Sequence, residues 1–152
     1  MSKKENLYKK LDEYKNFDRD NNHEKFLDTV DQIVLSGDPS CIPELLKYFN
    51  DESEYSWVFE SLSGAIEHFN VTDYVKELLK GLSILFPKGK EWAVSLVSRI
   101  FNDKDYLETF RNNMNLADKA SLLKLFDIME KESPHHKDLI AELRKELDKS
   151  GP

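Results

Sequence analysis

Cysteine is almost absent from this chain. Cys41 is the only one among 152 residues, so no intramolecular disulfide can form and a zinc site built from cysteines is excluded. Cys41 falls in the first turn of an expected helix, where the positive helix end favours a thiolate. Two interpretations of this residue remain: a nucleophile acting with a distant histidine, or a small buried apolar side chain.

Glycine, proline and long apolar runs are also scarce. Five glycines and five prolines are too few for an all-β protein with frequent turns. The apolar run GLSILF at 81–86 is too short to cross a membrane. The start MSKKENLYKKLDEY has charges but lacks the apolar core of a signal peptide. We therefore expect a cytoplasmic protein without a membrane-bound segment, folded as one domain over residues 1–152.

Positive charge is in deficit. Lysine and arginine number 22 against 29 acidic residues, which gives a formal net charge of −7. Such acidity opposes binding to nucleic-acid phosphates and suits a basic protein partner, although many cytosolic proteins are equally acidic without one. The lysines near the N-terminus are interleaved with acids, as on a solvated helix face. We expect a protein partner and no nucleic acid.

Motifs for catalysis or metal binding are missing as well. The adjacent His135 and His136 have diverging side chains, and the sequence contains neither HExxH nor carboxylates at metal-ligand spacing. Glu60 and Glu67 lie two turns apart on one expected helix, near the separation that glycosidases use, but solvated helices often carry such pairs. No glycine cluster opens a helix to hold phosphate. We expect no metal, no cofactor and no enzymatic activity.

The chain is instead rich in helical periodicity, most clearly at 53–70, SEYSWVFESLSGAIEHFN. Apolar residues recur there at steps of three and four, which makes one helix face continuously apolar. That face consists of Val58, Phe59, Leu62, Ala65, Ile66 and Phe69. The opposite face consists of Trp57, Glu60, Ser61, Gly64, Glu67 and His68. We expect the first face to pack in a core and the second to be available to another molecule.

Similar stripes along the rest of the chain predict about nine helices and no strand. A repeat underlies them: ELLK at 44–47 recurs 33 residues later at 77–80, and DYV at 73–75 is echoed by DYL at 105–107. Trp57 is echoed in the same way by Trp92. This spacing predicts an all-α fold, a HEAT-like α-solenoid of stacked helical hairpins, with an irregular helical bundle as the alternative. Residues 1–20 either join the stack or lie at its periphery.

In such a stack the second helix of each hairpin lines one side, usually the concave one. These helices are expected around residues 54–69, 89–102 and 116–132. Their outward positions are Trp57, Glu60, Glu67, Ser95, Arg99 and Lys124. Tryptophan and arginine are enriched at the energetic centres of interfaces. Trp57 could instead be half-buried against a neighbouring helix. Arg99 could instead pair with Glu60 or Glu67. Trp92 lies nearer the apolar face of its helix and is expected in the core.

The loop before this helix adds negative charge. Asp51, Glu52 and Glu54 stand beside Tyr55 and Trp57 and would steer a basic partner toward them. The predicted partner-binding residues are therefore Trp57, Glu60, Glu67, Arg99, Asp51, Glu52, Glu54 and Tyr55.

Four runs carry a resemblance to a known family: WVFESLSGAIEHF, YVKELLKGL, EWAVSLVSRIFN and DYLETF. Over roughly residues 40–112 the chain resembles the immunity protein 30 family, bacterial immunity proteins of polymorphic-toxin systems. The most specific parts are AIE at 65–67 ending at Phe69, and EWA at 91–93 leading to RIFN at 99–102. Phe101 stands where leucine is expected, a change of volume that a helical core can absorb.

The resemblance implies an all-helical protein that is made beside a toxin gene and protects its own cell by binding the toxin domain, without catalysis. It places Glu67 and Arg99 in matching runs, which makes them first candidates for the interface. The alternative is a helical-repeat adaptor for protein interactions unrelated to toxins. A base-excision glycosylase on a HEAT-like scaffold would need a basic groove, whereas the expected groove is acidic. The oligomeric state is not predicted.

Overall fold

The computed structural model describes residues 2–149, and this part of the chain is helical with no strand. The all-α prediction is confirmed. The α-helices are α1 (Lys3–Tyr14), α2 (Asn22–Leu35), α3 (Cys41–Leu46), α4 (Ser56–Ile66), α5 (Val71–Lys80), α6 (Leu82–Leu85), α7 (Lys90–Phe101), α8 (Lys104–Asn112), α9 (Lys119–Glu132) and α10 (Lys137–Lys149). Two short 3₁₀ helices, η1 (Met114–Leu116) and η2 (Pro134–His136), precede α9 and α10.

One helix more than expected arises at Gly81, which separates α5 from α6. The apolar stripe of α5 continues through Phe86 in the sequence, which indicates one helix that ends at Pro87, but Gly81 has φ −94° and ψ 5°. A Cβ atom at this position would lie 2.6 Å from Leu46 Cδ1 and 3.1 Å from Pro43 Cα of α3. A side chain at this position would therefore force Leu46 and Pro43 to shift, and the helix is interrupted where glycine allows the close contact with α3.

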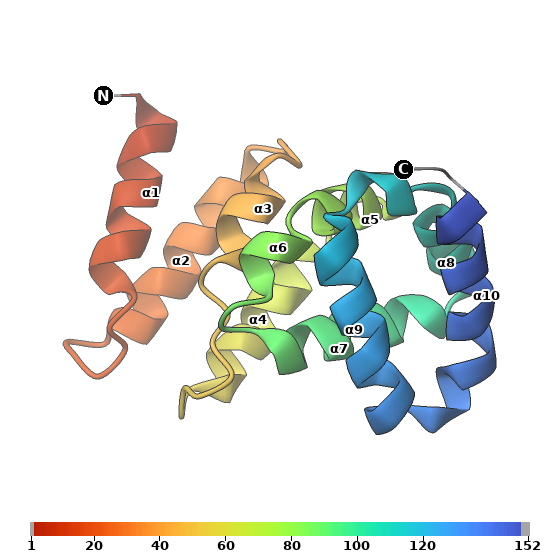
Figure 1. The fold of residues 1–152 in the computed structure, drawn as a ribbon. Coiled ribbons are helices and arrows are strands. Elements are labelled where there is room, and N and C mark those ends of the chain that lie inside the picture. Colours follow the sequence, from red (N-terminus) through yellow and green to blue (C-terminus); the bar gives the residue numbers. More distant parts are fainter. Residues whose placement is uncertain (1, 150–152) are drawn as a thin grey trace.

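The helices follow one another across the molecule broadly in chain order, from α1 at one end to α10 at the other (Figure 1). Helices that are not consecutive also pack together: α2 on α4, α3 on α5, α5 on α8, and α7 on α9. Stacked hairpins produce such contacts, because each hairpin buries its apolar surface against the next. The HEAT-like geometry itself stays a prediction.

The sequence repeat corresponds to neighbouring positions in space. The two ELLK runs lie in α3 and α5, which pack on each other. The two tyrosines of the DYV and DYL runs lie in α5 and α8, where the rings of Tyr74 and Tyr106 meet edge to face at 6.2 Å. The echo in the sequence thus marks residues that lie on helices packed against each other.

A hydrophobic core runs through the described helices, from Leu7 and Leu11 of α1 to Leu143 and Leu147 of α10. Helix α1 packs on α2, so its two leucines belong to this core. One domain over the whole chain stays a prediction. Trp92 is partly buried and packs against the core, as expected.

Cys41 is buried beneath α1, and this burial raises the pKa of its thiol to about 11. A thiol with such a pKa is protonated at neutral pH, which favours the interpretation as a small buried apolar residue. Within residues 2–149, no group of three or more histidine, cysteine or acidic side chains could hold a metal ion.

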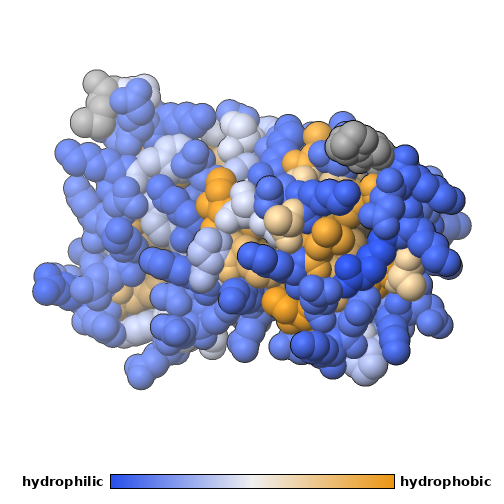
Figure 2. Space-filling model, in the orientation of Figure 1, coloured by the Kyte–Doolittle hydropathy of each residue, from blue (hydrophilic) through white to orange (hydrophobic). Residues whose placement is uncertain are grey.

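None of the described helices combines the length and the apolar character needed to span a bilayer. Hydrophilic residues cover most of the face shown in Figure 2, and apolar residues reach the surface near α6 and α9. Ile84 of α6 is 46% exposed.

The buried His136 makes folding stability depend on pH. Its Nε2 lies 3.1 Å from Asn102 Oδ1, its ring packs edge to face on Phe101, and burial, with a smaller effect of His135, lowers its pKa below 6.5. The unfolded chain therefore binds more protons than the folded chain below about pH 6.5, so the free energy of unfolding falls as the pH drops through this range.

We expect the free energy of unfolding of His136→Gln to fall less than that of the wild type when the pH drops. Urea unfolding at pH 7.5 and at pH 5.5 would measure the difference. His68→Gln, at an exposed histidine after α4, is the matched control and should keep the wild-type dependence. Equal pH dependence in His136→Gln and the wild type would contradict the assignment.

Candidate partner-binding surface

Helix α4 presents the two faces that its sequence predicts. Val58, Phe59, Leu62 and Ile66 are buried, while Ala65 and Phe69 pack partly buried against the core. Trp57, Glu60, Ser61, Gly64 and His68 are exposed, and Glu67 is partly buried just after the helix end. The face opposite the core is therefore accessible along the whole of α4.

Trp57 lies at the start of this face and is 49% exposed. Its ring packs edge to face on His23 at 5.1 Å and lies 6.4 Å from the ring of Tyr55. The Tyr55 hydroxyl donates a hydrogen bond to Asp18 Oδ1 at 2.8 Å, which fixes this neighbour in turn. Half of the Trp57 side chain therefore packs against neighbouring residues and the other half is exposed, while its role in an interface stays a prediction.

The acidic loop divides into two kinds of residue. Glu52 and Glu54 are exposed. The carboxylate of Asp51, in contrast, accepts hydrogen bonds from the backbone amides of Glu91 at 3.0 Å and Trp92 at 3.3 Å, in the first turn of α7. Helix α7 follows Gly89, which has no side chain to cap it, so Asp51 performs this role from a distant loop.

Removing this cap should destabilise the fold. We expect Asp51→Ala to lower the free energy of unfolding by about 0.5–2 kcal/mol, because two backbone amides of α7 lose their acceptor. Denaturant unfolding followed by circular dichroism would measure the loss. Glu52→Ala, at the exposed neighbouring residue, should change stability by less than about 0.5 kcal/mol. Equal effects of the two substitutions would show that Asp51 does not stabilise α7.

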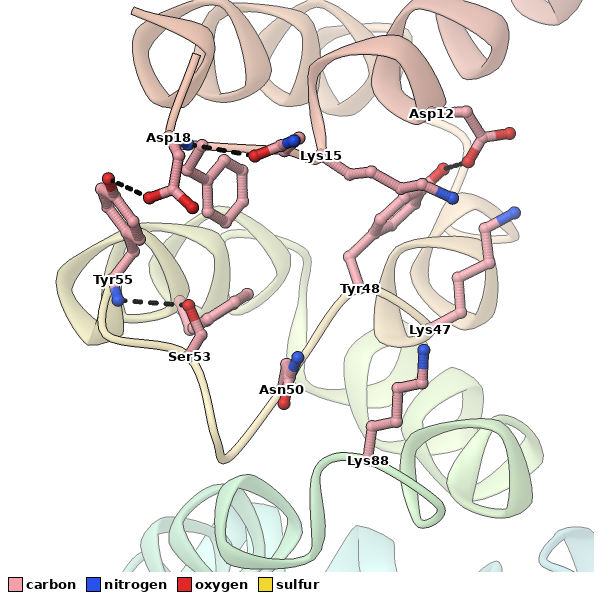
Figure 3. Close-up of a pocket in the computed structure, with 12 residues that line it drawn as sticks. Asp12, Lys15, Asp18, Lys47, Tyr48, Asn50, Ser53, Tyr55 and Lys88 are labelled. Carbon is pink, nitrogen blue, oxygen red and sulfur yellow. Dashed lines mark hydrogen bonds between the residues drawn. The ribbon is translucent and has the colours of Figure 1, made fainter.

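A cavity of about 490 Å³ lies beside the Trp57 end of α4 (Figure 3). Lys15, Lys47 and Lys88 line it, each placed after the C-terminal end of a helix, where a positive charge is favourable. Asp12 and Asp18 also line it and accept hydrogen bonds from tyrosine hydroxyls. This surface carries both signs of charge, whereas the sequence indicated an acidic one, because its lysines come from separate parts of the chain.

A smaller pocket of about 190 Å³ lies at the other end of α4. There Arg99 Nη1 of α7 lies 3.1 Å from Glu67 Oε1, so Arg99 pairs with Glu67 and not with Glu60. Burial raises the pKa of Glu67; Arg99 lowers it and Glu60 adds a smaller increase. The positive charge of Arg99 therefore replaces only part of the hydration that this carboxylate has lost.

Three further polar residues of this pocket were not predicted as site residues. Tyr74 of α5, Asp103 before α8 and Tyr106 of α8 line it together with Glu67 and Arg99. Asp103 caps α8, since its Oδ1 accepts from the amides of Asp105 and Tyr106. The signal that could have identified the tyrosines is the DY repeat, because its two copies lie on α5 and α8, which pack on each other.

The structure thus brings predicted residues together in two groups, one at each end of α4. Tyr55 and Trp57 form the first group, Glu67 and Arg99 the second, and the exposed Glu60 lies between them on α4. Trp57 and Glu67 are separated by about 15 Å at a rise of about 1.5 Å per residue. One partner interface of ordinary size, about 800 Å² on each side, could cover both groups.

The model of the protein family Immunity protein 30 matches residues 13–110, which is well over half of the chain. The match runs from the end of α1 into α8 and includes all eight predicted partner-binding residues. It extends further toward the N-terminus than the runs in which the resemblance is visible, and it confirms that resemblance. No curated protein and no solved structure matches the chain.

Proposed function

The chain belongs to the immunity protein 30 family, and we propose that it binds a cognate bacterial toxin domain in the cytoplasm and neutralises it. Neutralisation requires no catalysis by this chain, since a bound protein can cover the toxin's active site or the approach of its substrate. The interface in this proposal is the exposed face of α4 with Trp57, Glu60 and Glu67, together with Arg99 of α7. Glu52, Glu54 and Tyr55 border it, and Asp51 holds the loop in place.

One observation carries this choice of surface: Trp57 is a large aromatic side chain held at half exposure by His23 and Tyr55. An exposed tryptophan that is already fixed by its neighbours loses little conformational freedom on binding. Tryptophan is also among the residues that contribute most to interface energies. A partner that covers Trp57 would therefore gain affinity at a small entropic cost.

The charge of the chain suits a basic toxin domain. The net charge is −7, and Glu52, Glu54 and Glu60 are exposed around Trp57. Complementary charges increase the association rate more than the final affinity. In this proposal, association with the toxin slows as salt is added, because the charges are exposed and screened.

Co-expression tests the proposal. We expect a toxin domain encoded beside this gene to arrest growth when expressed alone, and the full-length chain to restore growth and to elute with the purified toxin domain as one complex. No rescue and no complex would overturn the proposal and leave the alternative of a helical-repeat adaptor with another partner. The Trp57→Ala chain, at matched expression, shows whether rescue depends on the α4 face.

A further inference from the structure

The pocket beyond the end of α4 is built by residues from four elements. Glu67 follows α4, Tyr74 lies in α5, Arg99 in α7, and Asp103 precedes α8. Its volume of about 190 Å³ is below the range of about 300–1,000 Å³ that small-molecule sites occupy. The pocket is therefore suited to a single inserted side chain.

Tyr74 supplies an unpaired polar atom at this place. The residue is only 1% exposed, and its hydroxyl has no hydrogen-bond partner among the described residues. Burial, followed by the negative charge of Glu67, raises the pKa of Tyr74 well above its usual value, so the hydroxyl is neutral and lies near that carboxylate. Buried hydroxyls are normally hydrogen-bonded, and a group that reaches this oxygen would complete its bonding.

The charges around the hydroxyl favour a cation. Two carboxylates, Glu67 and Asp103, line the pocket with one guanidinium, Arg99. Asp103 uses its Oδ1 to cap α8, so this cap does not occupy its Oδ2. Arg99 pairs with Glu67 but offsets only part of the desolvation of that carboxylate. A second positive group is therefore accepted electrostatically, whereas an acidic one would meet two carboxylates.

We propose that this pocket receives one basic side chain, lysine or arginine, of the toxin domain, an inference that rests on the proposed function. The inserted cation donates hydrogen bonds to the carboxylate of Glu67 and to the hydroxyl oxygen of Tyr74. Hydrogen bonds from a charged donor are stronger than neutral ones, and this site is partly shielded from water. An apolar side chain of the same size would leave the Tyr74 hydroxyl unpaired.

The affinity of the full-length chain for the co-purified toxin domain measures the effect, by isothermal titration calorimetry. We expect Tyr74→Phe to weaken binding about 3–10-fold, because it removes an acceptor of the cation, and Glu67→Gln to weaken it by about 10-fold or more, because it removes the negative charge that pairs with the cation. Tyr8→Phe is the matched control, since its hydroxyl is also buried without a hydrogen-bond partner but belongs to α1 and lines a different pocket, with Asp38 and Cys41. It should leave the affinity unchanged, and melting curves of all three variants verify folding.

The inserted residue is found by replacing each surface lysine and arginine of the toxin domain with methionine. We expect one such position at which Tyr74→Phe no longer changes the affinity, because the cation that used the hydroxyl is gone. If the wild-type complex forms and Tyr74→Phe changes the affinity equally in every one of these toxin variants, the pocket inference is wrong and the proposed function stands. If the wild-type chain forms no complex with the toxin domain, the proposed function itself fails.

Discussion

Replacing Leu62 with alanine is expected to lower the free energy of unfolding by about 2–5 kcal/mol. Leu62 lies in the middle of α4 with 0% of its surface exposed, on the face turned toward the core. Truncation removes its apolar contacts and leaves a cavity in the core, where α4 packs on α2. Domains of this size are stable by only about 5–15 kcal/mol, so the loss is a large fraction of the total.

Urea unfolding monitored by circular dichroism measures this loss. Ser61→Ala is the matched control: it changes the adjacent residue of the same helix, which is exposed, and should alter stability by less than about 0.5 kcal/mol. Similar unfolding free energies for Leu62→Ala and the wild type would show that α4 does not pack through this face.

The orientation of α4 could be predicted because it depends on local periodicity. Residues three and four apart share a helix face whatever the rest of the fold does, so the apolar stripe with Leu62 had to be the buried one. The break at Gly81 could not be predicted in the same way. It depends on how close α3 comes to α5, and Pro43 and Leu46, the residues involved, are more than 30 positions away.

The candidate surface was predicted only as far as helix faces and charge allow. The sequence named Glu67 and Arg99 and left two partners open for Arg99, and the distance of 3.1 Å selects Glu67. Asp51 was grouped with the acidic residues around it, although its carboxylate is used to cap α7. Its role depends on Gly89, which lies far along the chain and has no side chain to cap α7. Composition and periodicity do not show that the loop with Asp51 lies beside the start of α7.

The family could be identified from the sequence because its resemblance lies in short runs of consecutive residues. The candidate surface could not, because it depends on contacts between residues far apart in the chain. The pocket between α4 and α8 illustrates this difference. Tyr74 was visible as half of a repeat, yet its burial beside Glu67 follows only from the packing of α5 on α8. Repeats therefore predict which residues occupy equivalent places, and the packing decides which of them meet.

Replacing Trp57 with alanine is expected to weaken toxin binding by about 2 kcal/mol or more, which is roughly 30-fold in Kd. The exposed half of the indole offers a large apolar surface, and His23 and Tyr55 hold the ring in place before a partner arrives. Alanine removes both the surface and this preorganisation. Because the gain from burying Trp57 is made in the complex, the loss should appear mainly as faster dissociation, which surface plasmon resonance measures.

Ile84→Ala provides the control, since Ile84 is exposed to 46% and Trp57 to 49%, and Ile84 belongs to α6 and not to α4. It should leave dissociation unchanged if the α4 face is the interface. A Trp57→Ala chain that is folded and releases the toxin no faster than the wild type would remove this face as the interface. Faster release from Ile84→Ala alone would place the interface on α6 instead, where apolar residues also reach the surface (Figure 2).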